Sequence, residues 1–182
     1  MRRNSRARPG DPLDDRVGRA DLAILRLLGT APAEGPKPGG CPRADRRISV
    51  ARIGAALDTL HIRCLADGEG GLLAIWERHA MLFTVEGPRD EILVMRARPH
   101  ATVPPERADR AYRAVNEWNH TRRFGKAYVG DPTRSGQLPV FAEVEVPLEA
   151  GVHETLLVEL LGCGAAVAAS LVEWLHGEGG LL

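Results

Sequence analysis

The sequence predicts an α+β domain in which helices pack on an antiparallel β-sheet meander. Apolar residues recur with a period of two over residues 80–85 and again over 92–98, which places alternate side chains on opposite faces of a strand. Residues 86–90 lie between these runs and contain Gly-Pro, so the two runs are expected to form a hairpin. Apolar stretches of helical length stand before, between and after the strands. This segregation of helices from strands is typical of an α+β fold.

The expected order is helix, three or four strands, helix, two strands, helix. The first helix begins after Ser49, because serine is a good N-cap and the apolar residues that follow share one helical face. That face consists of Val50, Ile53, Leu57 and Leu60. Position 52 is arginine, so the Glu or Gln of a reciprocal capping box is missing. Strands then occupy about residues 62–99, with runs at 62–67 and 72–77 before the hairpin.

A second helix is expected after Pro104-Pro105, because proline is tolerated in the first helical turn. Its predicted buried stripe consists of Ala108, Ala111, Tyr112 and Val115. Strands at about 126–130 and 140–146 follow. In the second of these, Val140, Ala142, Val144 and Val146 are expected to face the core.

The last segment, residues 152–176, is apolar and helical, but Gly162-Cys163-Gly164 lies inside it. Glycine costs about 1 kcal/mol relative to alanine in a helix interior, so the pair of glycines predicts a kink or a break. These glycines follow a helical run rather than a strand, which excludes a dinucleotide-binding loop. Close helix packing is the interpretation that remains.

The 182 residues carry 24 basic and 24 acidic side chains, yet the zero net charge conceals two different parts. Residues 1–47 hold 11 basic and 6 acidic residues (+5), and the remainder holds 13 and 18 (−5). The first part is rich in Arg, Pro and Gly and is expected to be a mostly disordered tail, with a transient helix at 20–28 that stays free or docks on the domain or a partner. Residues 48–182 form the folded domain. The tail lacks interleaved aromatic residues, so specific nucleic-acid binding is not expected.

Cysteine content and hydropathy indicate in which cellular compartment the protein is expected. Cys41, Cys64 and Cys163 are an odd, scattered set, which argues against a disulfide framework and fits a reducing environment. No run of 18 or more apolar residues is present, so no membrane span is expected. Arg2-Arg3 is not followed by the apolar region of a secretory signal. The sequence therefore predicts a cytoplasmic protein.

No constellation of titratable residues points to catalysis. Glu117-x-x-His120 has the spacing of a di-iron ligand pair, but a di-iron site needs a second copy and further carboxylates. His153-Glu154 begins like a zinc-protease motif, yet position 157 is leucine. We therefore expect neither an enzyme nor a bound metal or cofactor.

Asn116 and Asn119 lie near the expected end of the second helix. Their amides are expected to be structural and to satisfy backbone groups where the helix meets the next strand, with a ligand site as the alternative. Cys64 and Cys163 are expected to be inert thiols in a strand and a helix.

The element order, the Asn116-x-x-Asn119 pair and the segment GDPTRSGQLPVFAEVEVPLEAGVHETLLVELL together resemble the YbjN family. The segments LLAIWERHAMLFTVEG and EILVMRARPHATVP are most similar to its actinobacterial branch. The resemblance covers about residues 48–178. It implies a fold similar to that of type III secretion chaperones and a small non-enzymatic domain, often dimeric, described as a sensory-transduction regulator or chaperone-like protein.

Two functional hypotheses follow. The first is a homodimeric protein-binding module that holds an unknown protein partner on its helix–sheet surface, with the large apolar residues Trp118, Phe141 and Trp174 as candidate contacts if they are exposed rather than in the core. The second is a small-molecule sensor in which Arg96, Arg98 and His100 bind an anionic metabolite. A concave pocket beneath these cationic residues would favour the sensor, and a flat surface would favour the binding module.

Overall fold

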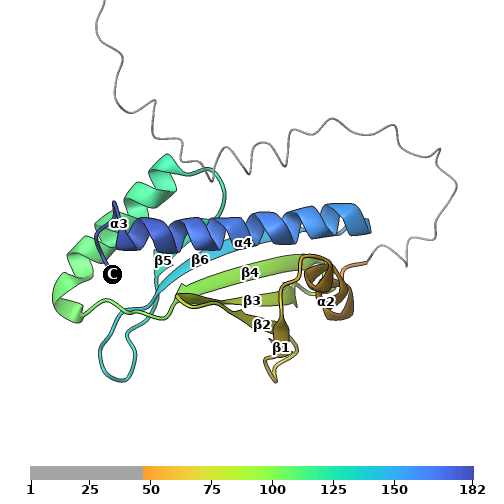
Figure 1. The fold of residues 1–182 in the computed structure, drawn as a ribbon, viewed down its shortest axis with the longest axis horizontal. Coiled ribbons are helices and arrows are strands. Elements are labelled where there is room, and N and C mark those ends of the chain that lie inside the picture. Colours follow the sequence, from red (N-terminus) through yellow and green to blue (C-terminus); the bar gives the residue numbers. More distant parts are fainter. Residues whose placement is uncertain (1–46) are drawn as a thin grey trace, which may run out of the picture.

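Residues 47–182, which the computed structural model describes, form a six-stranded antiparallel sheet whose helices gather on one face (Figure 1). The tail expected at residues 1–47 lies outside the described residues except for Arg47, and so does the helix expected at 20–28. The strands follow one another across the sheet in the order β1-β2-β3-β4-β6-β5. This is the α+β architecture that the sequence predicts. The elements are α2 (Val50–Thr59), β1 (Cys64–Ala66), β2 (Leu72–Ile75), β3 (His79–Glu86), β4 (Ile92–Pro99), the 3-10 helix η3 (Pro105–Arg107), α3 (Ala108–Thr121), β5 (Lys126–Val129), β6 (Val140–Pro147) and α4 (Glu154–His176).

The hairpin of β3 and β4 has the register that the alternation predicts. Phe83 pairs with Met95, and both side chains are buried under the helices. On the other side of β4, Met95 pairs with Val144 of β6. The alternate residues, such as Arg96, point to the face of the sheet that carries no helix, which we call the open face.

The two strands before the hairpin are shorter than the runs predicted at 62–67 and 72–77. The carboxylate of Asp67 accepts hydrogen bonds from the backbone N–H groups of Glu69 and Gly71, both at 2.8 Å, and closes the turn between β1 and β2. These bonds, the one from Gly71 first, lower the pKa of Asp67. The polar turn thus takes up residues that sequence alternation assigned to strands.

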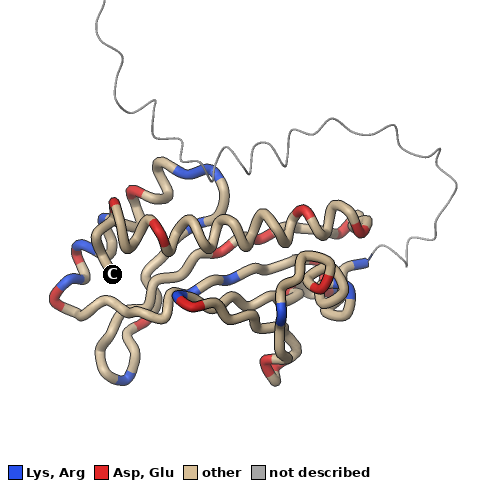
Figure 2. The backbone as a smooth tube through the Cα atoms, viewed as in Figure 1, with Lys and Arg blue, Asp and Glu red and all other residues tan. Residues whose placement is uncertain are grey.

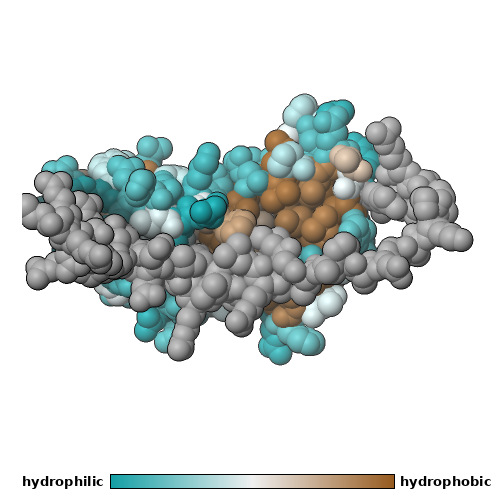
Figure 3. All heavy atoms as spheres, turned by 90° about the horizontal axis from the view of Figure 1, so that it is seen from above, coloured by the Kyte–Doolittle hydropathy of each residue, from teal (hydrophilic) through white to brown (hydrophobic). Residues whose placement is uncertain are grey.

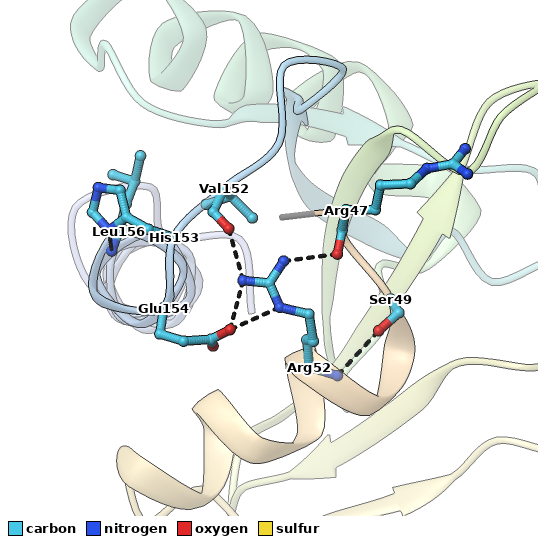
Figure 4. Close-up of polar contacts among 7 residues, drawn as sticks. All are labelled: Arg47, Ser49, Arg52, Val152, His153, Glu154 and Leu156. Carbon is cyan, nitrogen blue, oxygen red and sulfur yellow. Dashed lines mark hydrogen bonds and ion pairs between the residues drawn. The ribbon is translucent and has the colours of Figure 1, made fainter. Parts of the chain in front are cut away.

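Helix α2 begins where it is predicted, and the Oγ of Ser49 accepts the N–H of Arg52 at 3.4 Å. The guanidinium of Arg52 donates to the carbonyl of Arg47 at 2.7 Å, to the carbonyl of Val152 at 2.7 Å and to the carboxylate of Glu154 at 2.8 Å (Figure 4). The arginine that breaks the capping box therefore joins α2 to the start of α4. We call this contact the Arg52 junction.

Helix α3 buries Ala111, Ala114, Val115 and Trp118, which recur every three or four residues. The predicted stripe is correct for Ala111 and Val115 but wrong for Tyr112, which is 52% exposed. Tyr112 lies one position past the buried row and so turns its ring towards solvent.

Helix α4 runs without interruption, so the kink or break predicted at Gly162-Cys163-Gly164 is wrong. Gly164 is buried against the sheet, and a Cβ at this position would lie 2.5 Å from the Sδ of Met95. Gly162 has no such neighbour, since the nearest atoms are those of Leu60 at 3.8 Å. Gly164 therefore lets α4 approach β4 closely, and this packing outweighs the helix cost of about 1 kcal/mol per glycine.

Candidate functional site

The three aromatic residues expected at a partner surface lie in different environments. Trp118 and Trp174 are 1% and 7% exposed, and their rings pack on each other with centroids 5.7 Å apart. Both belong to the core, so the hypothesis that they are exposed to a partner is wrong. Phe141 is half-buried on the open face, where its ring stacks on that of Tyr128 at 5.3 Å.

The cationic residues proposed for an anionic metabolite lie on or beside the open face of β4. Arg96 is paired with Glu143 of β6, and this hydrogen bond is the main cause that raises the pKa of Arg96. The Nε2 of His100 bonds the carbonyl of Trp76 at 2.9 Å, and Arg98 is exposed. Two cavities of the described chain, of about 240 and 700 Å³, include none of these three cationic residues. The expected pocket beneath them is therefore not among these cavities.

The structural role predicted for Asn119 is present. Its side chain accepts the N–H of Ala127 at 2.8 Å and donates to the carbonyl of the same residue at 2.9 Å, which fixes the end of α3 to β5. Asn116 is exposed one turn earlier, and among residues 47–182 it makes no comparable contact. The prediction thus holds for one member of the pair.

The larger cavity is a groove of about 700 Å³ between α4 and the end of β6. Its floor is formed by Met95 of β4 and by Val144 and Val146 of β6. One wall is formed by Leu160 and Cys163 of α4. The opposite wall is the connection from α3 to β5, residues 122–126. We call this cavity the α4 groove.

The α4 groove exists because β5 is shorter than its neighbour. The pairing of β5 with β6 begins at Lys126 and Glu143, so residues 144–147 of β6 pair with β4 on one side and have no strand beside them on the other. These residues form a short open edge, with backbone groups available for hydrogen bonds. The groove thus combines an apolar floor with an unpaired strand edge.

The side of α4 that faces away from the sheet is also apolar. Between Glu154 and Glu173 the only charged residue is Glu159, and Gly162 and Ala166 on this side are partly exposed. Less than half (44%) of the most apolar 18-residue window of α4 is buried. Figure 3 shows apolar residues gathered over the first half of α4, bordered by polar ones. Packing on the sheet therefore accounts for one side of α4 only.

By length and composition, α4 is also the one helix of residues 47–182 that is able to span a membrane. This differs from the prediction of no membrane span, which considered only uninterrupted apolar runs. Leu157, Leu161 and Leu171 are at most 1% exposed and pack in the core under α4. Core packing of this kind gives a helix the same composition as a membrane span.

The lining of the α4 groove carries charges of both signs, basic on the α3–β5 connection and acidic at Glu143 and Glu145 of β6. Arg123 and Lys126 are exposed at the end where Gly125 approaches Val167 in the middle of α4. Glu145 and Glu159 lie nearer the start of the helix, and Figure 2 shows the basic α3–β5 connection and the acidic start of α4. An elongated ligand with a negative and a positive end would be oriented by this arrangement.

Cys163 is the cysteine in the lining of the α4 groove. Burial raises the pKa of the Cys163 thiol, so this cysteine is protonated near neutral pH and is a poor nucleophile. Among the described residues, no group of three or more His, Cys, Asp and Glu is placed to hold a metal ion. His153, one of the motif residues considered from the sequence, caps α4 by accepting the N–H of Leu156 at 3.2 Å. Glu117 and His120 are exposed on α3.

The α4 groove was not predicted from the sequence, although one signal pointed to it. A helix that packs on one face of a sheet needs one apolar side, and α4 is apolar on nearly all sides. The apolar residues that the sheet does not cover indicate that α4 makes a second apolar contact. The residues that form the opposite wall and the floor come from elements far apart in the chain. No pattern in the sequence indicated that these elements lie together.

Comparison with known proteins assigns the chain to a family. Residues 49–177 match the model of the YbjN family, whose description is "Putative bacterial sensory transduction regulator". The chain belongs to the YbjN family. The match extends from the N-cap of α2 to the end of α4, which agrees with the resemblance found over residues 48–178.

A solved structure shares the fold of this YbjN chain. It is the crystal structure of YbjN from E. coli, described as "a putative transcription regulator". The two superpose with a TM-score of 0.59 at 12% identity, and the match covers 72% of this chain and 94% of that one. At this identity the similarity shows the fold alone. No curated protein sequence matches the chain.

Proposed function

We propose that this YbjN chain, of the actinobacterial branch, is a non-enzymatic regulator that acts by holding a protein segment in the α4 groove. One observation carries the proposal: the apolar groove continues into the apolar outer side of α4. A volume of about 700 Å³ lies within the range of ligand-binding clefts, roughly 300–1,000 Å³. Apolar helix faces and open strand edges are both surfaces to which peptide segments bind. The family description as a regulator supports the same class of function.

The groove favours a partner segment with a particular pattern. Its floor and α4 wall suit an amphipathic helix or an extended apolar segment. Arg123 and Lys126 suit an acidic residue at one end of that segment, with an effect that weakens as salt increases. An apolar groove with charged residues at its rim would allow the chain to bind a flexible region of another protein, as a chaperone does.

The chain is further proposed to be cytoplasmic and to form a homodimer, as the family resemblance implies. A separate surface is available for the second copy. Leu65 and Ile75, on the open face of β1 and β2, are 68% and 60% exposed. Sedimentation equilibrium of the wild-type chain and of Leu65→Lys/Ile75→Lys tests this, and an unchanged dimer in the variant excludes this surface.

The alternative function, a sensor for an anionic metabolite, has weaker support. Arg96 already has a carboxylate partner, and the cavities of about 240 and 700 Å³ do not reach it. A thermal-shift screen of anionic metabolites tests this alternative, with Arg98→Ala as the variant that abolishes any stabilisation.

The main proposal is tested by affinity capture from native lysate, read by mass spectrometry. Arg123→Glu/Lys126→Glu reverses two exposed charges at the groove, and Arg113→Glu/Arg134→Glu reverses two exposed charges elsewhere. We expect a partner that wild type and the control capture in near-stoichiometric amount and that the groove variant loses. Equal capture by both variants, or no capture by a folded wild-type chain, contradicts the proposal.

A further inference from the structure

The α4 groove has a fitting occupant within this chain. We infer that residues 21–28 bind in the α4 groove and compete there with a partner segment. This inference rests on the proposed function and deepens it, because it names what fills the same groove before a partner arrives. Three observations support it: the composition of the segment, its charges, and the point where the described chain begins.

The composition of the segment matches the groove. Residues 21–28 read DLAILRLL, and six of these eight residues are apolar. As a helix the segment would be about 12 Å long, which is shorter than α4 and close to the length of its first two or three turns. A helix of this length is marginal in water by itself. Burial against Val144, Val146 and Leu160 would supply the contact that the isolated segment lacks.

The charges of the segment match those that line the groove. Asp21 precedes the apolar residues and Arg26 lies near their end. With Asp21 beside Arg123, Arg26 lies towards Glu145, which also lines the groove. The opposite orientation would place Asp21 towards Glu145 and Arg26 towards Arg123. More broadly, residues 1–47 carry +5 and the rest of the chain −5, so the two parts attract each other.

The described chain begins near the start of α4. The Arg52 junction holds the carbonyl of Arg47 next to Val152 and Glu154, at the start of α4 (Figure 4). Arg47 lines the smaller cavity rather than the α4 groove, so a tail segment would pass the start of α4 to reach the groove. Eighteen residues lie between Leu28 and Arg47, and a random-coil chain of this length would span about 25 Å on average. The 23 residues of α4 extend about 35 Å, so the first half of the helix is within reach.

The tether has a quantitative consequence for partner binding. A short flexible linker gives an effective concentration on the order of 1 mM. A segment with an intrinsic dissociation constant of about 0.1 mM would then occupy the groove most of the time and weaken a competing partner roughly tenfold. Weak intrinsic binding is therefore sufficient for regulation. Modification or capture of the tail would release the groove.

Cys163 in the groove wall provides the test. In the full-length chain with Cys41→Ser, the variant Leu25→Cys is oxidised at alkaline pH, because burial raises the pKa of the Cys163 thiol, and intramolecular disulfides are quantified by mass spectrometry. The matched control is Ala33→Cys, which is closer to Arg47 in sequence. A tail without a binding site would bring the control to Cys163 more often, because shorter loops close more readily. We expect the Leu25→Cys disulfide in severalfold higher yield, unchanged on tenfold dilution.

Three outcomes overturn the inference. The first is a yield for Leu25→Cys no higher than for Ala33→Cys. The second is a disulfide whose yield falls on dilution, which indicates that the segment binds a second copy. The third is a yield that Asp21→Lys leaves unchanged, since that substitution places like charges together at the basic α3–β5 connection.

The same chains separate this inference from the proposed function. We expect Leu25→Glu/Leu28→Glu to release the groove and to strengthen partner capture roughly tenfold, relative to wild type. Capture that depends on Arg123 and Lys126 but does not respond to this tail variant overturns the inference and leaves the function standing. A specific disulfide together with no captured partner supports the inference and contradicts the function.

Discussion

The two sides of α4 are similar in composition but differ in environment. The inner side, with Leu157, Leu161 and Gly164, is buried against the sheet. The outer side, with Gly162 and Ala166, is partly exposed, and Glu159 is the only charge along the middle of the helix. The inner side explains why the domain is stable. The outer side is only partly packed against the core, and we propose that it takes part in binding.

The open face of the sheet is a second solvent-exposed surface that can be compared with the outer side of α4. It also meets solvent, yet Arg96 and Glu143 form a cross-strand ion pair there, and the hydroxyl of Tyr128 donates to the same carboxylate at 3.2 Å. Charged pairs keep a solvent-facing sheet soluble and discourage association. On the helix side, the outer surface of α4 carries a single charge, Glu159, between Glu154 and Glu173.

The largest expected effect comes from truncating a leucine on the inner side. Leu161 is fully buried, and Leu161→Ala should lower the free energy of unfolding by about 2–5 kcal/mol. Leu156 is on the same helix but half-buried, and Leu156→Ala should cost about 1 kcal/mol or less. Urea denaturation of both variants measures the difference. Equal costs would show that the two sides of α4 are packed alike.

Removal of the Arg52 junction should come next in size. Arg52→Ala removes hydrogen bonds to two carbonyls and to a carboxylate, and we expect a loss of about 1.5–3 kcal/mol. Arg52→Lys keeps the charge but not the planar guanidinium, so it should recover only part of the loss. Amide hydrogen exchange should become faster in residues 154–160 than in the second half of α4. Uniform exchange along the helix would argue against a local role.

The two glycines of α4 offer a matched substitution on opposite sides. Gly164→Leu forces a side chain against Met95 and should destabilise the domain by about 1–3 kcal/mol. A Cβ added at Gly162 meets only Leu60 at ordinary contact distance, so Gly162→Leu should stabilise the helix by about 0.5–1 kcal/mol. Thermal unfolding of the pair checks the opposite signs. A stabilising Gly164→Leu would mean that α4 does not lie as close to β4 as described.

The smallest expected effect is a dependence on pH that originates away from α4. His79 is 7% exposed and stacks on Trp76 with ring centroids 4.9 Å apart. Burial, followed by the charge of His100, lowers the pKa of His79. The folded state therefore takes up the proton less readily than the unfolded state, so this contribution to stability is complete above about pH 6.5 and declines as the pH falls below it.

His79→Phe is the matched control for that dependence, because it keeps an aromatic ring but does not titrate. Its free energy of unfolding should vary less than that of wild type between pH 7.5 and 5. Variants on the outer side of α4 should follow the wild-type pH profile. If His79→Phe follows it as well, the decline has another origin, such as carboxylates that titrate at lower pH.

Local signals in the sequence determined much of the fold. Period-two alternation predicted the β3–β4 hairpin and its buried face, because the side-chain period of a strand is fixed by backbone geometry. Ser49 predicted the start of α2, because a cap depends only on residues three positions away. The order of the elements and the amino-acid sequence of residues 48–178 were sufficient to identify the family.

Tertiary structure decided what depends on contacts between distant residues. The sequence could not show that Gly164 lies against Met95, that Trp118 and Trp174 pair in the core, or that Arg52 reaches a carbonyl 100 residues away. The α4 groove belongs to the same class, since its walls come from α3, β6 and α4. Short-range propensities are encoded in consecutive residues, whereas packing and burial exist only once separate elements meet, and in this chain they meet on one face of the sheet.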